Sequence, residues 1–291
     1  MTLIGVLLAG AVAGFVLGFA GAGGTIVGIP FYLYIADVAP HQTLGTNALG
    51  VAAIGIFLLV VRGLRDELRY GPGIAFAIPG LIGVYFGTRA STYVSGSRLV
   101  FFLGFVVLIV AAYIFYLSTR DVTHSPGAAV RSSAQEPGVL PDEPATGSRT
   151  LQVAVPARLA DVDDSVPANR QFGPIALRTG SLGLAVGAVA GFFGIGGGFM
   201  IVPGTSWAAK IDLKVAAAAS LIPITAFAAF VGGRYAVAGS TSFPHAGIMA
   251  LTGIVFGSFG IWLSTKVPTT PFQRVFAGLL VLVGIYMIIF H

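Results

Sequence analysis

Two glycine clusters at a fixed separation constrain this chain more than any other feature of its sequence. The cluster GFAGAGG spans residues 18–24 and GFFGIGG spans 191–197, so adding 173 to a residue number carries one onto the other. The same offset aligns Pro30 with Pro203 without a gap. We interpret the chain as an internal duplication, in which each half carries a glycine cluster inside an apolar stretch.

The duplication divides the chain into two transmembrane repeats, 1–118 and 175–291, joined by a linker at 119–174. The linker holds seven of the eleven acidic residues together with many Pro, Ser and Ala residues, which predicts a polar and largely disordered segment. The first apolar segment has a counterpart in the second half. We therefore expect it to belong to the fold and not to be a cleaved leader.

The composition indicates an all-α polytopic membrane protein. Hydrophobic residues make up 56% of the chain and charged residues only 9%, with a mean hydropathy of +0.91, whereas soluble domains carry about 25% charged residues. Apolar runs long enough to cross a bilayer occur at 3–20, 43–61, 71–88, 99–118, 175–193, 215–233, 246–264 and 272–290. A net charge of +5 is typical of Lys and Arg retained on the cytoplasmic side and does not indicate nucleic-acid binding.

The glycine clusters are predicted to break the first helix of each half. As one helix at about 1.5 Å per residue, the apolar stretch from Leu3 to Ala36 would be longer than the bilayer core is thick. A break at 21–24 lets residues 25–36 return as a short helix, and residues 199–209 do the same in the second half. Counting these returns gives five segments in each half and ten in all, against eight without them.

The positive-inside rule favours ten segments, with the halves inverted and the N-terminus outside. This arrangement places nine basic residues inside and three outside, while eight segments give six on each side. The nine are Arg62, Arg65, Arg69, Arg120, Arg178, Lys210, Lys214, Lys266 and Arg274, and the three are Arg89, Arg98 and Arg234. The sequence leaves open whether the short helices cross fully or re-enter.

Broken helices are tolerated in a bilayer only where they are buried in protein or line a wet cavity, so the breaks are predicted to mark a binding site. The free N–H groups and positive dipole end of each short helix suit an anion, with Thr25 expected at the N-cap of the first. Thr46 and Asn47 align with Ala219 and Ser220, which puts polar groups at one repeat-equivalent position. The candidate substrate-binding residues are Gly21, Gly23, Gly24, Thr25, Thr46, Asn47, Gly194, Gly196, Gly197, Gly198 and Ser220.

Structural roles compete with binding for some of these residues. Gly10, Gly14 and Gly18 follow the spacing of helix-packing glycines, and the clusters could serve packing alone. Asn47 and Ser220 could equally bond a neighbouring helix. Arg89 and Arg234 lie near segment ends, where they could attract an anion or simply reach the interface.

The ionisable residues favour an anionic substrate over a proton or a metal cation. No Asp or Glu lies inside any apolar run, although proteins that move protons or cations usually carry one there. The sequence contains no cysteine, metal-ligand cluster, Walker A loop or catalytic triad. We therefore predict a protein that is not an enzyme and has neither a metal site nor a cofactor.

These motifs together resemble the TauE/SafE family of membrane transporters, also described as sulfite exporters. The resemblance rests on AGFVLGFAGAGGTIVGIP, its repeat AGFFGIGGGFMIVP, the GTNALG and AASLIP stretches, and the closing VFAGLLVLVGIYMII. It covers both halves and excludes the linker, which is longer than the short loop usual in relatives. Asn47 also departs from the hydroxyl residue expected there. The resemblance implies transport of sulfite, sulfonates or related small organic anions without ATP.

The function predicted from the sequence is a secondary transporter of the cell membrane that exports small sulfur-containing oxyanions by alternating access. One alternative is an anion channel, and another is a membrane scaffold or assembly factor acting through the linker. The expected partners are the small anionic substrate and the lipid bilayer. The sequence leaves open the identity of the anion, the coupling ion, the direction of transport and the oligomeric state.

Overall fold

The computed structural model describes residues 2–64, 68, 70–120, 172–196, 198–209, 213–267 and 269–289. Every regular element in these ranges is a helix. The first half contains α1 (Thr2–Ala20), α2 (Gly24–Pro30), the π-helix η1 (Phe31–Ile35), α3 (Pro40–Gly63), α4 (Tyr70–Ser91) and α5 (Gly96–Arg120). The second contains α7 (Phe172–Phe193), α8 (Gly198–Ala209), α9 (Leu213–Val237), α10 (Phe243–Ser264) and α11 (Thr269–Ile289). Most of the predicted linker lies outside the described residues.

The helices form a polytopic membrane bundle. Five of them, α1, α3, α4, α9 and α10, are long and apolar enough in their described parts to cross a bilayer, and shorter apolar helices lie at Gly24–Ile35, Gly96–Ala112, Thr179–Phe193 and Leu280–Ile289. Large apolar side chains such as Phe102 and Ile109 on α5 and Val255 on α10 are exposed on the outside of the bundle. Lipid tails would cover such a surface in a membrane.

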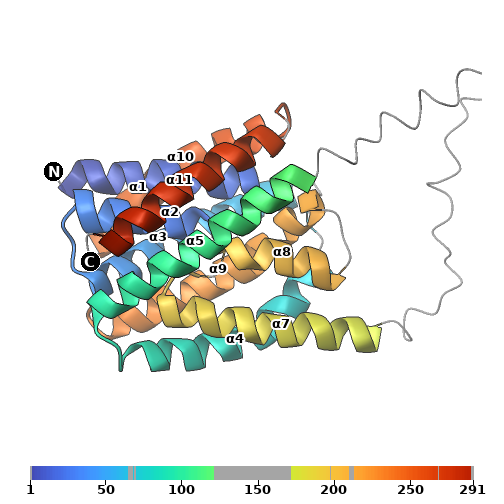
Figure 1. The fold of residues 1–291 in the computed structure, drawn as a ribbon, viewed down its shortest axis with the longest axis horizontal. Helices are drawn as coiled ribbons and strands as arrows, with labels where there is room; N and C mark the ends of the chain where they lie inside the picture. The colour runs from blue at the N-terminus through green and yellow to red at the C-terminus, as the bar shows by residue number, and fades with distance from the viewer. Residues whose placement is uncertain are drawn as a thin grey trace, which may run out of the picture.

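The chain begins and ends at the same end of the bundle. In Figure 1 the N-terminus of α1 and the C-terminus of α11 lie at one end of the bundle, and the last turn of α5 and the first turn of α7 lie at the opposite end. We call the first end the terminal face and the second the linker face. Each half therefore has four long helices and one short helix after the break, and the two halves run in opposite directions between the two faces.

Contacts between the halves follow the duplication. Glycines of α1 lie against the backbone of α10, with Gly14 at Gly253 and Gly18 at Gly257. The equivalent glycines of α7 lie against α4 in the same way, with Gly187 at Gly80 and Gly191 at Val84, and each of these positions is 173 residues from its counterpart. The first helix of each half thus packs on the fourth helix of the other, and the glycines allow the backbones to approach. The packing role considered for Gly14 and Gly18 is the one that the structure shows.

The returning segment of the first half runs from the middle of the bundle to the terminal face. A β-carbon placed on Gly24 would lie 2.5 Å from the carbonyl oxygen of Ala13, halfway along α1, while one on Gly5 would lie 2.8 Å from the amide nitrogen of Ala36. The chain therefore turns back inside the bundle, and α2 begins near mid-depth.

Candidate functional site at the two helix breaks

The first helix breaks where the sequence predicts, at residues that need a left-handed backbone. Gly21 and Gly23 have φ of 70° and 89°, a region that glycine adopts without steric cost. The N-cap of α2 is Gly23, and no side chain caps this helix. The expected N-cap role of Thr25 is therefore wrong. The left-handed turn at Gly23 lets the helix begin at Gly24, so Thr25 lies inside its first turn.

The second break has the same construction. Gly194 and Gly196 have φ of 66° and 60° and are the repeat equivalents of Gly21 and Gly23. Gly198 is the first residue of α8, and Gly197 lies outside the described residues. The repeated pair of left-handed glycines explains why both clusters contain more glycine than helix packing alone would need.

The two breaks meet at the centre of the bundle. A β-carbon on Gly198 would lie 3.0 Å from the amide nitrogen of Gly23, and one on Gly196 would lie 3.5 Å from Cγ2 of Thr25. Away from this contact, Gly21 lies against Ala217 and Gly194 against Leu44, two positions that are themselves repeat equivalents. The start of α2 therefore faces the start of α8, which brings two positive helix ends together.

Asn47 links α3 to the first of these helix ends. Its Nδ2 donates a hydrogen bond of 3.0 Å to the carbonyl oxygen of Thr25, and its Oδ1 lies against Gly28, where any β-carbon would collide with it. Asn47 is 0% exposed and Thr25 is 1% exposed. Among the described residues, Oδ1 of Asn47 and Oγ1 of Thr25 have no hydrogen-bond partner. Two buried polar atoms beside the breaks are thus left to bind something else.

The side chains of the other two polar candidates, Ser220 and Thr46, form hydrogen bonds within the protein. Oγ of Ser220 donates a 2.6 Å hydrogen bond to the carbonyl oxygen of Ala216 in its own helix. Oγ1 of Thr46 accepts a 3.0 Å hydrogen bond from the amide of Ser242, just before α10. The hydroxyl of Ser220 therefore completes a helix bond, and that of Thr46 ties α3 to the start of α10.

Two residues that sequence reasoning passed over have roles near the centre or end of the bundle. Thr225 on α9 is buried, and its Oγ1, which faces Gly55, has no hydrogen-bond partner in the described ranges. It lies one turn from Ala228, which contacts Gly196. A hydroxyl two residues after Pro223 in an apolar helix was the available signal. Arg62 is nearly buried, and its Nη2 donates a 2.8 Å hydrogen bond to the carbonyl oxygen of Gly18 near the end of α1.

The two arginines considered as anion attractors lie away from the breaks. Arg89 is exposed in the last turn of α4, where its Nη1 donates a 3.3 Å hydrogen bond to the hydroxyl of Tyr85. Arg234 is exposed in the last turn of α9. Both helices end at the terminal face. Within the described ranges, Asp37 is the only carboxylate and no group of three possible metal ligands occurs.

The fold is that of a polytopic membrane protein, with apolar helices long enough to cross a bilayer. Its two halves run in opposite directions and their helix breaks face each other, as in many secondary transporters. The family model for the sulfite exporter TauE/SafE family matches residues 6–287. The chain therefore belongs to this family of membrane transporters.

Two bacterial relatives illustrate the similarity. A "Probable membrane transporter protein" of Xylella fastidiosa strain Temecula1 is 26% identical over 290 residues, covering 99% of this chain and 95% of the relative. The "Probable membrane transporter protein YunE" of Bacillus subtilis strain 168 is 24% identical over 300 residues, covering 99% of this chain and 98% of the relative. No solved structure matches the chain significantly.

Proposed function

We propose that this transporter exports small sulfur-containing oxyanions, such as sulfite or short organosulfonates, across the cell membrane by alternating access. The observation that carries the proposal is the meeting of the two breaks, where Gly23 of one half lies against Gly198 of the other and Thr25 lies against Gly196. Helix starts leave about four backbone N–H groups without helical partners. Two such ends aimed at one point favour a negative charge between them.

The side chains at this point suit an oxyanion with several oxygen atoms. The hydroxyl groups of Thr25 and Thr225 are buried with no hydrogen-bond partner in the part of the chain that the structure describes, and each has a proton to donate. Oδ1 of Asn47 is an acceptor, which matches the O–H of a hydrogensulfite ion or of an ordered water. The one carboxylate of the described chain, Asp37, follows η1 at the terminal face and adds no negative charge at the centre.

The absence of a cationic side chain from this set favours an anion of low charge. A buried charge is costly unless it is paired or hydrogen-bonded, and here the compensation comes from helix dipoles and uncharged donors. A monoanion such as hydrogensulfite or an alkylsulfonate is therefore expected to bind more tightly than sulfate, which carries two charges at neutral pH.

A thermal-shift screen of the purified protein tests the choice of substrate. A ligand that binds the folded state raises the midpoint of unfolding. We expect sulfite and methanesulfonate to raise this midpoint more than sulfate or chloride does at equal ionic strength. A midpoint that responds to none of the sulfur anions, or equally to chloride, would contradict the proposal.

A further inference from the structure

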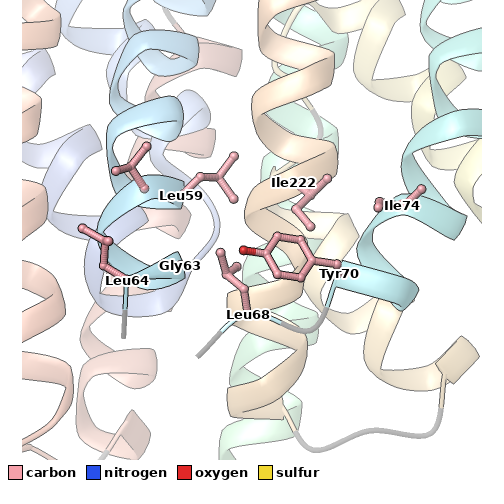
Figure 2. A pocket seen from close by; sticks show the side chains of 8 residues that line it. Leu59, Gly63, Leu64, Leu68, Tyr70, Ile74 and Ile222 are labelled. Atoms are coloured by element: carbon pink, nitrogen blue, oxygen red, sulfur yellow. The ribbon is translucent and has the colours of Figure 1, made fainter. Parts of the chain in front are cut away.

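The linker-face end of the bundle has a hollow that the central site does not include. It has a volume of about 470 Å³ and lies between the end of α3, the start of α4 and α9. Figure 2 shows Leu59 on α3 and Ile222 on α9 on opposite sides of this space, with Leu68 and Tyr70 near its outer end. Its other lining residues are Val60, Gly63, Leu64 and Ile74.

The inner end of the hollow lies one helical turn from the proposed binding site. Leu59 follows Gly55 by four residues on α3, and Gly55 is in contact with Thr225. Ile222 precedes Thr225 by three residues on α9. Residues three or four apart share one face of a helix, so Leu59 and Ile222 stand between the hollow and the buried hydroxyl of Thr225.

The repeat-equivalent positions at the terminal face are closed. The offset of 173 carries Leu59 to Gly232 and Ile222 to Leu49. These two are in contact, because a β-carbon on Gly232 would lie 2.8 Å from Cγ of Leu49 and 2.9 Å from its amide nitrogen. Nearby, a β-carbon on Gly45 would lie 2.7 Å from the carbonyl oxygen of Ser240. The loop before α10 therefore sits tightly on the start of α3.

The terminal face is held by a hydrogen bond. The sequence provides no counterpart of this bond at the linker face. Oγ1 of Thr46, which is fully buried, accepts from the amide of Ser242 in this loop. The repeat equivalent of Thr46 is Ala219, which has no hydroxyl group. In the described parts of the chain, the terminal face thus has a hydrogen bond that Ala219 cannot form at the linker face.

We infer that this structure is the conformation open toward the linker face, with Leu59 and Ile222 at the inner end of the access path and Leu49 and Gly232 as its closed counterpart. This inference rests on the proposed function, since it assigns an access path to that central site. The Thr46–Ser242 bond biases the resting protein toward this conformation. The apolar lining allows the path to close by expelling water.

The bias determines which face of the membrane the empty site is open to. The positive-inside rule places the linker face in the cytoplasm, so the resting protein is loaded from the cytoplasm. This arrangement suits an exporter, because the empty site is then exposed to its substrate, while the net direction of flux follows the electrochemical gradient.

Thiol labelling tests the inference directly, because the chain has no cysteine. Thr225→Cys places one thiol at the centre, and Ile222→Cys provides a second position should the first variant fold poorly. Each is treated with a membrane-impermeant methanethiosulfonate in oriented vesicles, with the reagent on one face at a time. We expect labelling at least about tenfold faster from the linker face. Equal rates from both faces, or faster labelling from the terminal face, would overturn the inference.

Two substitutions at Thr46 test the hydrogen bond. Thr46→Val keeps the shape of the side chain but loses the acceptor, and it should reduce the ratio of the two labelling rates severalfold. Thr46→Ser keeps the hydroxyl and should preserve the ratio. An unchanged ratio in Thr46→Val would overturn the role of this bond. Labelling requires no anion. A protein that keeps the ratio of labelling rates but transports no sulfite would therefore contradict the proposed substrate, and the inferred access path would still be supported.

Discussion

Gly198→Ala is expected to weaken anion binding at the helix breaks without preventing the helices from folding. Gly198 opens α8 and is not among the glycines with positive φ, so alanine can adopt its backbone conformation. Its methyl group would lie 3.0 Å from the amide nitrogen of Gly23 and would cover the N–H that we assign to the anion. Alanine also favours a helix by roughly 0.5–1 kcal/mol over glycine, which offsets part of the crowding.

The expected loss follows from the value of one hydrogen bond to a charged group, about 1.5–3 kcal/mol. Since about 1.4 kcal/mol corresponds to a factor of ten, sulfite should bind about 10- to 100-fold more weakly to Gly198→Ala. Titration of the thermal midpoint with sulfite measures this affinity, and flux in proteoliposomes measures its consequence for transport.

Gly204→Ala is the matched control on the same helix. Its β-carbon would lie 3.4 Å from Cε2 of Phe76, an ordinary van der Waals distance remote from the breaks. We expect sulfite affinity to stay within about twofold of the parent protein, since no group of the site is covered. A folded Gly198→Ala protein with the affinity of the parent would refute the assignment of the Gly23 amide to the anion.

Three further predictions concern the fold and its orientation. Gly14→Ala should destabilise the protein by about 1–3 kcal/mol, because its β-carbon would lie 2.6 Å from the carbonyl carbon of Gly253, whereas Gly247→Ala has open space and should leave the thermal midpoint unchanged. Arg62→Gln should lower the midpoint as well, since the charge-assisted hydrogen bond to Gly18 is worth about 1.5–3 kcal/mol; a midpoint equal to the parent's would show that this bond contributes no stability. Reporter fusions at the N-terminus and after His291 should both lie outside the cytoplasm, and a cytoplasmic signal from both would contradict the orientation.

The duplication made much of the fold predictable from the sequence. Glycine clusters at one offset predicted the positions of both breaks, and both helices do end there, where Gly21, Gly23, Gly194 and Gly196 have positive φ. The uneven distribution of basic residues predicted that the halves run in opposite directions. Both inferences depend on local chemistry, which a sequence carries directly.

The sequence could not predict how side chains at the site are oriented. A repeat shows which residues are equivalent but not which ones touch, so the packing of α1 on α10 became visible only in the structure. Thr46 and Asn47 are neighbours in the sequence, yet successive residues of a helix point about 100° apart. One therefore binds the loop before α10 and the other binds α2. Thr225 was missed because its importance comes from tertiary contacts.

Exchange of radiolabelled sulfite across proteoliposomes tests the central claim most directly. Vesicles loaded with unlabelled sulfite should take up external label in a saturable manner, because a site at the helix breaks binds one anion at a time. The uptake should be lost in Asn47→Ala, which removes the bond to Thr25, and in Ser220→Leu, which places a larger side chain at a fully buried position. Uptake no greater than in empty liposomes, uptake that never saturates, or equal uptake by both variants and the parent would contradict the account.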